Sequence, residues 1–445
     1  MAMKKNGKMA AVILAAVLVA ATAGCSKNQS GEGGNAGTEA LKTSGERQLN
    51  VLVEAGSPAF DVAEQTATEF EEQTGIKVNI DAVPYSGMYD KLAAEVTSQV
   101  GLYDVACVDT VWMAGLKNGL LPLDDIVTDE MKLDFPETLV TDGTLDGTLY
   151  GLPAWANGKV LLYRTDLFED NTEKENFKAK YGYELKVPGT WQEYLDVAEF
   201  FTRDNDKDGT IDMYGTSLSA KTGGDTVISF LEMAIQAGGT PLVLDGEQQV
   251  MVNQQAYVDA LNHMKALYDA QCVPAGIFEM AAADHVKMFS EGKLAMAPVW
   301  CAMYANAVDK DSSQVAAQTG VAVMPAGPEG VGIVPAPFYH VIMKGSGQQE
   351  AAAEYLKFIN DKNSLYINRG MAGRTSVLES EKDAHPQLKV LLDSMQSPLS
   401  EGRPKVVQWN EIESAINVAI QNVLKGQQTP EDALDTLKSE IEEMF

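Results

Sequence analysis

One short acidic stretch has the residue types and the spacing to bind a metal ion. In "DNDKDGTID", residues 204–212, carboxylates recur at alternate positions and a glycine stands at the sixth. EF-hand loops surround one calcium with oxygens at the first, third, fifth and ninth positions and a backbone carbonyl at the seventh. We therefore expect one structural calcium, with Asp204, Asp206, Asp208, the carbonyl of Thr210 and Asp212 as its ligands.

The last position of this loop limits what a calcium ion could do there. The twelfth residue is Gly215, where a sensor loop has a bidentate glutamate, and the chain has no second loop of this kind. The sequence therefore favours a static calcium clip that adds stability, with its missing ligand supplied from elsewhere in the fold. An acidic, solvated turn that holds no ion is the alternative interpretation.

Charged and aromatic residues at the ends of apolar runs predict a second kind of site. Glu54 follows "LNVLV", Asp109 follows "VACV", and Trp112 comes three residues later. Trp155 in "LPAWANG" and Trp300 after "KLAMAPV" also adjoin apolar segments. Charged residues directly after apolar strands rarely belong to a core. Because a sugar needs flat aromatic surfaces and a few fixed hydrogen-bonding groups, residues of these types could bind one.

Apolar spacing predicts the elements that must position these residues. Strand and helix patterns alternate in the first part of the chain, as they do in a parallel α/β layer. Ligands of such sheets bind beyond the carboxyl ends of the strands, where Glu54 and Asp109 lie. The predicted elements are a strand at 49–53, a helix at 60–74 capped by Gly75, a strand at 76–83 closed by Pro84, a helix at 89–100 and a strand at 104–108.

The beginning of the chain has the pattern of an export signal. Three lysines precede an uninterrupted apolar run at residues 9–21, which is too short to cross a bilayer comfortably. The small residues of "TAG" then precede Cys25, which resembles the lipobox of bacterial lipoproteins, although Thr22 stands where leucine is usual. The resemblance implies a signal peptide at 1–24 and lipidation of Cys25. An ordinary cleavage site near a cysteine is the alternative.

The next segment and the overall charge indicate where the protein works. Residues 25–48 are rich in Gly, Ser, Asn and Thr, so they should form a flexible tether between a lipid and a folded body. The formal net charge of −29 argues against nucleic acid and anionic lipid surfaces as partners. We expect an extracytoplasmic protein that is anchored to the cell membrane through Cys25.

Cysteines and known catalytic motifs offer little evidence for an enzyme. The three remaining cysteines, Cys107, Cys272 and Cys301, lie in apolar surroundings and predict neither a disulfide nor a zinc site. The sequence has no G-x-S-x-G, H-E-x-x-H or phosphate-loop motif, and its four histidines are widely spaced. We expect no catalytic cofactor and no catalytic residue.

Several segments resemble, in their order, the family 1 extracellular solute-binding proteins of sugar-type ABC importers, which include maltose-binding-protein-like chains. The resemblance covers essentially everything after the tether. It implies an α/β, two-lobed, periplasmic-binding-protein type II-like fold, with a mixed, mostly parallel sheet in each lobe and crossing segments between them. The segments include "FEEQTGIKVNI", "DGTLYGLPAWANGKVLLYRTDLF", "TWQEYLDVAEFFTRDNDKDGTIDMYG", "FSEGKLAMAPVW", "AAAEYLKFI" and "WNEIESAINVAIQNVLKGQQTPEDAL".

The resemblance also implies lobe boundaries and a ligand cleft between the lobes. The N-terminal lobe would comprise 49–154 and 340–373, and the C-terminal lobe 155–339 and 374–445. Each candidate has a structural alternative: a tryptophan can belong to the core, and Arg374 can form a salt bridge between lobes. The expected ligand-binding residues are Glu54, Tyr85, Asp109, Trp112, Trp155, Asn157, Trp300, Tyr339, Arg374 and Trp409.

Family membership implies a monomeric binding protein that captures a sugar or oligosaccharide and delivers it to an ABC permease in the membrane. Strong acidity and a single candidate arginine in the cleft disfavour a phosphorylated cargo. A secreted carbohydrate-active enzyme of the glycoside hydrolase kind is one alternative, because such enzymes also combine aromatic residues with paired carboxylates. A surface adhesin or receptor that never delivers cargo is another.

Overall fold

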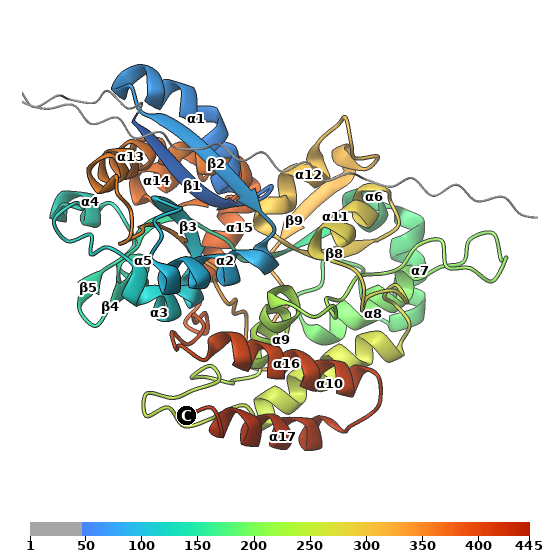
Figure 1. The fold of residues 1–445 in the computed structure, drawn as a ribbon. Coiled ribbons are helices and arrows are strands. Elements are labelled where there is room, and N and C mark those ends of the chain that lie inside the picture. Colours follow the sequence, from blue (N-terminus) through green and yellow to red (C-terminus); the bar gives the residue numbers. More distant parts are fainter. Residues whose placement is uncertain (1–46) are drawn as a thin grey trace, which may run out of the picture. The chain divides into compact units, whose positions relative to one another are not determined.

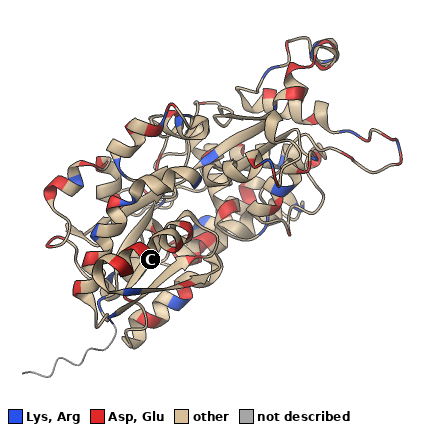
Figure 2. Ribbon diagram, turned by 90° about the horizontal axis from the view of Figure 1, so that it is seen from above, with Lys and Arg blue, Asp and Glu red and all other residues tan. Residues whose placement is uncertain are grey.

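The computed structural model describes residues 47–445. The expected signal peptide, the lipidation site at Cys25 and almost all of the expected tether therefore lie outside the described residues. Among the helices of residues 47–445, none is long and apolar enough to cross a membrane. Acidic residues, red on the ribbon in Figure 2, are spread over many helices and loops of this part of the chain.

A six-stranded sheet holds the predicted α/β layer, and its strand order is β11-β6-β10-β3-β1-β2. β1 pairs in parallel with both β2 and β3, which confirms the predicted strand, helix, strand order. β10 runs antiparallel to β3 and β6, and β11 runs antiparallel to β6. The strands are β1 Gln48–Glu54, β2 Lys77–Val83, β3 Val105–Asp109, β6 Leu152–Ala156, β10 Phe338–Ile342 and β11 Met371–Ala372.

A second sheet has three strands in the order β8-β7-β9, and all its pairings are antiparallel. Mixed sheets were expected, but the expected parallel majority is wrong for both sheets. Only β1, β2 and β3 follow one another through covering helices, and the remaining strands reach the sheets from distant parts of the chain. The bounds are β7 Lys159–Arg164, β8 Met296–Trp300 and β9 Thr319–Ala322, with a separate hairpin of β4 Thr144–Leu145 and β5 Thr148–Leu149.

Local sequence signals set the ends of the helices that cover the first sheet. α1, Pro58–Thr74, begins where Ser57 accepts a hydrogen bond from the amide of Phe60, and it ends at Gly75 with φ +70°. α2, Tyr85–Ser98, begins four residues earlier than predicted, directly after Pro84. α1 packs on β2, α2 contacts β1, and α13, Gln349–Asp361, contacts β10 and α1.

A group of helices packs together beside the second sheet (Figure 1). α9 contacts α10 and α16, α10 also contacts α8 and α17, and α16 contacts α17. α11 packs on β8, and α15 packs on β7 and β9. The bounds are α8 Trp191–Phe201, α9 Gly224–Gln236, α10 Gln255–Asp269, α11 Ala282–Ser290, α15 Pro386–Met395, α16 Trp409–Leu424 and α17 Pro430–Glu442.

Short helices fill the connections between these elements. The short α-helices are α3 Met113–Leu116, α4 Asp129–Leu133, α5 Glu137–Asp142, α6 Thr165–Glu169, α7 Asn171–Tyr181, α12 Tyr304–Val308 and α14 Thr375–Glu381. The 3-10 helices are η1 Thr110–Trp112, η2 Lys117–Gly119, η3 Cys301–Met303, η4 Ala316–Gln318 and η5 Asn363–Arg369.

Buried apolar side chains form two large core clusters in the described part of the chain. One includes the helices beside the second sheet, and the other includes Phe70, Trp155 and Tyr355 of the first sheet and its helices. Cys107, Cys272 and Cys301 are buried and free, which confirms the prediction that they form no disulfide. The core thus holds both sheets in place and fixes where their strands end.

Candidate functional site

A cavity of about 460 Å³ lies where strand ends and helix beginnings meet. This volume is within the range of small-molecule binding sites. β1, β3 and β8 contribute their carboxyl ends, β6 and β10 contribute aromatic side chains, and α1, α2, α9 and α11 contribute residues at their N-terminal ends. The lining therefore combines exposed backbone at helix beginnings with charged and aromatic side chains.

The beginning of α9 reaches the cavity through a glycine pair. Gly223, the residue before α9, has φ +148°, a backbone conformation that residues with a side chain rarely adopt. It has no side chain that could cap the helix. Its amide donates to Oδ1 of Asn417 on α16 at 3.1 Å. Gly223, Gly224 and Asp225 all line the cavity, so the first turn of α9 forms part of its wall.

An aromatic pair and one further indole line the cavity. Trp155 of β6 and Phe338 of β10 face each other on neighbouring strands, with ring centroids 4.5 Å apart and ring planes 11° apart. Trp155 is 3% exposed, so most of its surface is occupied by this stack and the core. Trp300, the last residue of β8, is only partly buried. Trp300 is therefore the cavity-lining indole with the most surface left for a ligand.

Asp109, at the end of β3, is held in a buried network. Its Oδ1 accepts from Nη2 of Arg403 at 2.7 Å and from the amide of Val111 at 3.3 Å. Its Oδ2 accepts from the hydroxyl of Tyr85 at 2.8 Å. Burial alone would lower the pKa of Arg403, but the charges of Asp109, Tyr85 and Glu413 outweigh burial and raise it. The guanidinium therefore stays charged beside its acid.

Glu54, at the end of β1, is the acid without a fixed partner. Its side chain has no hydrogen bond or ion pair within residues 47–445. Burial, and second the charge of Asp109, raise the pKa of Glu54 to about 7. A carboxyl group with this pKa changes its ionisation near neutral pH, and a ligand in the cavity can shift that balance.

A second ion pair, between Lys159 and Asp225, adjoins the cavity at the first turn of α9. Nζ of Lys159 donates to Oδ1 of Asp225, whose Oδ2 accepts from the hydroxyl of Ser219 at 2.5 Å. Nζ also lies 4.6 Å from the ring centroid of Trp300. Burial would raise the pKa of Asp225, but the charge and hydrogen bond of Lys159, together with Ser219, lower it. Asp225 is therefore ionised at neutral pH.

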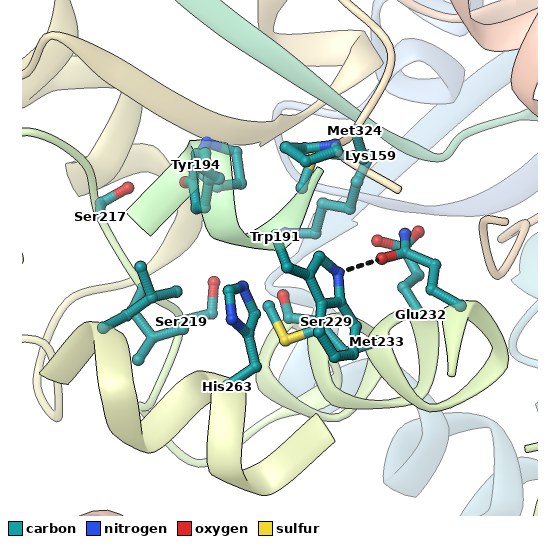
Figure 3. A pocket seen from close by; sticks show the side chains of 15 residues that line it. Lys159, Trp191, Tyr194, Ser217, Ser219, Ser229, Glu232, Met233, His263 and Met324 are labelled. Atoms are coloured by element: carbon teal, nitrogen blue, oxygen red, sulfur yellow. Dashed lines mark hydrogen bonds between the residues drawn. The ribbon is translucent and has the colours of Figure 1, made fainter. Parts of the chain in front are cut away.

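A much smaller cavity, of about 30 Å³, lies beside Lys159 (Figure 3). Lys159, Glu232 and Trp191 are among the residues around it. Nε1 of Trp191 donates to Gln236 at 2.8 Å, and the indole stacks on His263 with 4.5 Å between centroids. This cavity holds no more than about two water molecules, so it is too small for a cargo.

Six of the ten expected ligand-binding residues meet at the large cavity. These are Glu54, Tyr85, Asp109, Trp155, Asn157 and Trp300. Asn157 uses its Oδ1 to accept from the amides of Gly158 and Ala302, both at 3.1 Å. It therefore fixes the connection between β6 and β7 as well as bordering the cavity.

The other four expected residues do not line this cavity. Trp112 is buried beside Tyr85, with 4.7 Å between ring centroids. The hydroxyl of Tyr339 donates to the carbonyl of Leu139 at 2.9 Å. Two more have protein partners: Arg374 pairs with Asp134 at 2.7 Å, and the buried Trp409 donates to Glu413 at 3.2 Å.

Several lining residues carry no sign of a site in the sequence. Arg403 stands in "EGRPKVV", away from any predicted strand, and Arg369 stands at the end of η5, where it pairs with Asp61 at 2.6 Å. Met280 and Met303 look like ordinary apolar residues. The one available signal was the glycine pair of "TGGD" before α9, because a glycine pair at a helix start lets a ligand approach the backbone.

Three of the five expected ligands converge in the acidic loop. The carboxylates of Asp204, Asp206 and Asp208 lie within 4.8 Å of one another. Asp204 accepts from the amides of Asp208 and Gly209 at 3.2 and 2.9 Å, and Gly209 has φ +92°. A Cβ atom at Gly215 would lie 1.8 Å from the carbonyl oxygen of Ala198, so no side-chain ligand fits at the twelfth position. The oxygen set suits a hard cation such as calcium.

The comparison with protein families gives one match over most of the chain. A family model described as "Bacterial extracellular solute-binding protein" matches residues 43–362. A "Probable ABC transporter-binding protein" of Deinococcus radiodurans is 26% identical over 408 residues, which are 88% of this chain and 92% of that protein. The "Diacetylchitobiose binding protein DasA" of Streptomyces coelicolor is 23% identical over 98% of this chain and 97% of its own.

Solved structures share the fold. The structure described as "Maltose bound T. maritima MalE3" superimposes with a TM-score of 0.78 and 23% sequence identity, and it covers 89% of this chain and 100% of that one. At this identity the match establishes the fold, an α/β periplasmic-binding-protein fold with mixed sheets flanked by helices. It agrees with the sheet topology described above.

Proposed function

The chain belongs to the family of bacterial extracellular solute-binding proteins, and we propose that it captures a neutral sugar or short oligosaccharide in the 460 Å³ cavity for an ABC importer. Members of this family bind solutes and are not enzymes. The observation that carries the proposal is a cavity lined by aromatic rings and by as many acidic as basic side chains.

Charge balance supports a neutral cargo. The lining acids are Glu54, Asp109 and Asp225, and the lining bases are Lys221, Arg369 and Arg403. Every base except the exposed Lys221 is already paired with an acid of the protein. A phosphate or carboxylate ligand would have to compete with those acids and would approach the unpaired Glu54. An uncharged molecule rich in hydroxyl groups would neither compete with these acids nor be repelled by Glu54.

The aromatic surfaces and the relatives support a sugar in particular. Trp300 offers an indole face, and Glu54 offers acceptor oxygens for hydroxyl groups. An aromatic stack contributes about 0.5–1.5 kcal/mol beyond its buried area, and a hydrogen bond to a charged group about 1.5–3 kcal/mol. A relative named for diacetylchitobiose and a fold neighbour bound to maltose are consistent with a cargo of one or two rings.

A ligand screen tests this proposal. The purified chain without its first 24 residues should gain thermal stability with at least one saccharide from a panel that includes maltose, diacetylchitobiose and mannitol. Calorimetry should give a saturable, micromolar Kd, and chromatography should return the saccharide unchanged. Trp300→Ala should weaken binding at least tenfold. Cleavage of the saccharide would favour the glycoside hydrolase alternative, and no binding across the panel would refute the proposal.

The lobe boundaries expected from the sequence form part of the proposal. Residues 49–154 with 340–373, and 155–339 with 374–445, would form two lobes that close on the ligand. Asp109 and Arg403 belong to different expected lobes, so their ion pair would join the two lobes. Small-angle scattering should show a smaller radius of gyration when a bound saccharide is present, since only a closed state lets both lobes touch one ligand.

Lipid anchoring and calcium complete the proposal. Cys25 would carry the lipid, residues 25–48 would give a monomeric body its reach toward the permease, and mass spectrometry of membrane-extracted protein tests this assignment. Calcium would bind the loop of Asp204 to Asp212 as a structural ion, because Asp204, Asp206 and Asp208 already converge there. An adhesin that never delivers its cargo remains distinguishable through uptake of labelled saccharide in cells lacking the protein.

A further inference from the structure

Lys159 is a buried cation that lies behind the wall of the ligand cavity. It is the first residue of β7 and is 2% exposed. It borders the small internal cavity (Figure 3), and it is not among the residues that line the large one. Two of its contacts, Trp300 and Asp225, do line the large cavity. Any effect of Lys159 on a ligand must therefore pass through these two residues.

The contact with Trp300 follows from strand pairing. Lys159 and Trp300 stand directly opposite each other on the antiparallel strands β7 and β8. Cross-strand neighbours are close enough for long side chains to touch, and Nζ lies 4.6 Å from the indole centroid. Since Lys159 does not reach the large cavity, it contacts the indole from the protein side and leaves the cavity side free. Cation–π attraction is strongest for a desolvated cation of this kind.

The contact with Asp225 fixes the start of α9. Asp225 is the second residue of that helix and accepts from both Lys159 and Ser219. A carboxylate in a first turn also interacts favourably with the helix dipole. The ion pair and the hydrogen bond from the amide of Gly223 to Asn417 together restrain this part of the cavity wall.

The surroundings of Lys159 leave it few other partners. Glu232 of α9 and His285 of α11 are both buried nearby. Burial raises the pKa of Glu232 to about 8 and lowers the pKa of His285 to about 4, so both are mainly uncharged at neutral pH. One ionised acid, Asp225, thus faces the ammonium group, and the indole of Trp300 occupies another side.

We propose that Lys159 is a positioning residue. It holds the ring of Trp300 as a flat platform for the ligand and connects that ring to the first turn of α9. The proposal rests on the proposed function for the identity of the ligand, whereas the contacts of Lys159 do not depend on that function. A tryptophan side chain has two rotatable bonds and several staggered rotamers. A buried cation against one face selects a single orientation before the ligand arrives, so less ordering is left for binding to supply.

Fluorine NMR tests the proposal without any ligand. The chain contains five tryptophans, so 5-fluorotryptophan labelling should give five resonances, and Trp300→Phe identifies the one from Trp300. In Lys159→Met the Trp300 resonance should split or broaden while the other four keep their positions. Lys159→Arg, which keeps a cation and an ion pair, should restore one sharp line. If the methionine variant does not fold, Lys159→Gln replaces it, because glutamine still donates to Asp225.

Arg203→Met is a matched control for the loss of a stacked cation. Arg203 pairs with Glu173 at 2.6 Å and lies over the rings of Phe200 and Phe201, at 4.9 and 5.1 Å from their centroids. It borders neither cavity. Its removal should leave the Trp300 resonance unchanged. An unchanged Trp300 resonance in the Lys159 variants as well would overturn the proposal.

A binding cycle adds a second test, with maltose or whichever saccharide of the panel binds the parent. Lys159→Met should weaken binding at least tenfold alone and by a clearly smaller factor when Trp300 is already alanine, because only the contact of Lys159 with Asp225 then remains to be lost. Equal losses in both backgrounds would mean that Lys159 acts independently of Trp300, which would refute the proposal. A parent that binds no saccharide counts against the proposed function only, since the fluorine measurement needs no ligand.

Discussion

The two ion pairs beside the ligand cavity have the same kind of contact but different structural roles. Arg403 and Asp109 are 294 residues apart, and their side chains are only 2% and 3% exposed. The acid of this pair also accepts from Tyr85 and from the amide of Val111, so its acceptor sites are occupied by protein donors. Lys159 and Asp225 are 66 residues apart, and Asp225 stays partly exposed on the cavity side.

The difference shows that a charge at a ligand cavity is not by itself a ligand contact. Asp109 has little capacity left for a sugar hydroxyl, so its role is to hold β3 against the segment before α16. Asp225 and Trp300 keep free surface, and the cation behind them has no route to the ligand. We infer that the first pair holds distant parts of the chain together and that the second shapes the binding surface.

The comparison predicts that breaking the Arg403–Asp109 pair has the largest effect. Arg403→Met should lower the free energy of unfolding by about 3–5 kcal/mol, because Asp109 is left buried without a counter-charge. Urea denaturation measures this loss. Arg403→Met combined with Asp109→Asn should recover part of the stability, since the uncompensated charge is then gone.

Arg374→Met is the control for this prediction. Arg374 and Asp134 form a similar ion pair, but their side chains are 27% and 24% exposed. Water can replace the lost partner there, so we expect a cost of about 1 kcal/mol or less. Equal losses from Arg403→Met and Arg374→Met would show that burial does not separate the two kinds of pair.

Glu232, next to the second pair, should make stability depend on pH. Burial raises its pKa from 4.5 to about 8 in the folded protein. The folded state therefore binds the proton more tightly than the unfolded state, and its contribution to stability is lost as the pH rises from about 4.5 to 8. Glu232→Gln should reduce this dependence and gain on the order of 5 kcal/mol relative to the parent at pH 9. Parallel stability curves for parent and variant between pH 5 and 9 would contradict the assignment.

Glu54 should make ligand affinity depend on pH, in addition to its effect on stability. Its pKa is about 7 without a ligand, and hydroxyl donors favour the ionised form. Affinity for a neutral sugar should therefore rise up to about tenfold between pH 6 and pH 8, with proton release on binding. Calorimetry in buffers of different ionisation enthalpy measures both quantities. Glu54→Gln should flatten the affinity profile, whereas Glu232→Gln should leave it as in the parent.

The difference between local and long-range contacts explains how far the sequence could predict the fold and the site. Apolar spacing and a short apolar run identified β1, α1, β2 and β3, because these elements follow one another along the chain. These patterns could not identify β10 or β11 as their neighbours, since those strands join the sheet from far along the chain. Strand ends correctly placed Glu54, Asp109 and Trp300 beside one cavity.

Residue type alone could not tell a ligand contact from an internal partner. Trp112 and Trp409 are the same residue type as Trp300, yet one packs against Tyr85 with tilted rings and the other donates to Glu413. Arg374 was a plausible cleft arginine, but Arg369 and Arg403 are the arginines that line the cavity. That choice depends on long-range packing, which the local sequence around "EGRPK" does not contain.

The acidic loop extends the comparison from buried to exposed charges. We expect the smallest effect on stability there. Asp206, Asp208 and Asp212 are exposed, and Asp204 is partly buried. Water screens exposed charges, so the loop tolerates its acids without a base, and an ion that binds only the folded state can still add stability. Calcium at 1 mM should raise Tm by a few degrees over EGTA, and Asp204→Ala should abolish that rise.

Two controls make the calcium prediction specific. Asp311→Asn removes an exposed acid outside the loop and should leave the calcium-dependent rise in Tm intact. Magnesium should stabilise less than calcium, because it demands a near-ideal octahedral site, whereas calcium accepts irregular sets of six to eight oxygens. Saccharide affinity should stay the same with and without calcium, because none of the loop residues lines the cavity. A calcium-independent Tm would instead favour a solvated acidic turn, whose carboxylates are satisfied by backbone amides such as those of Asp208 and Gly209.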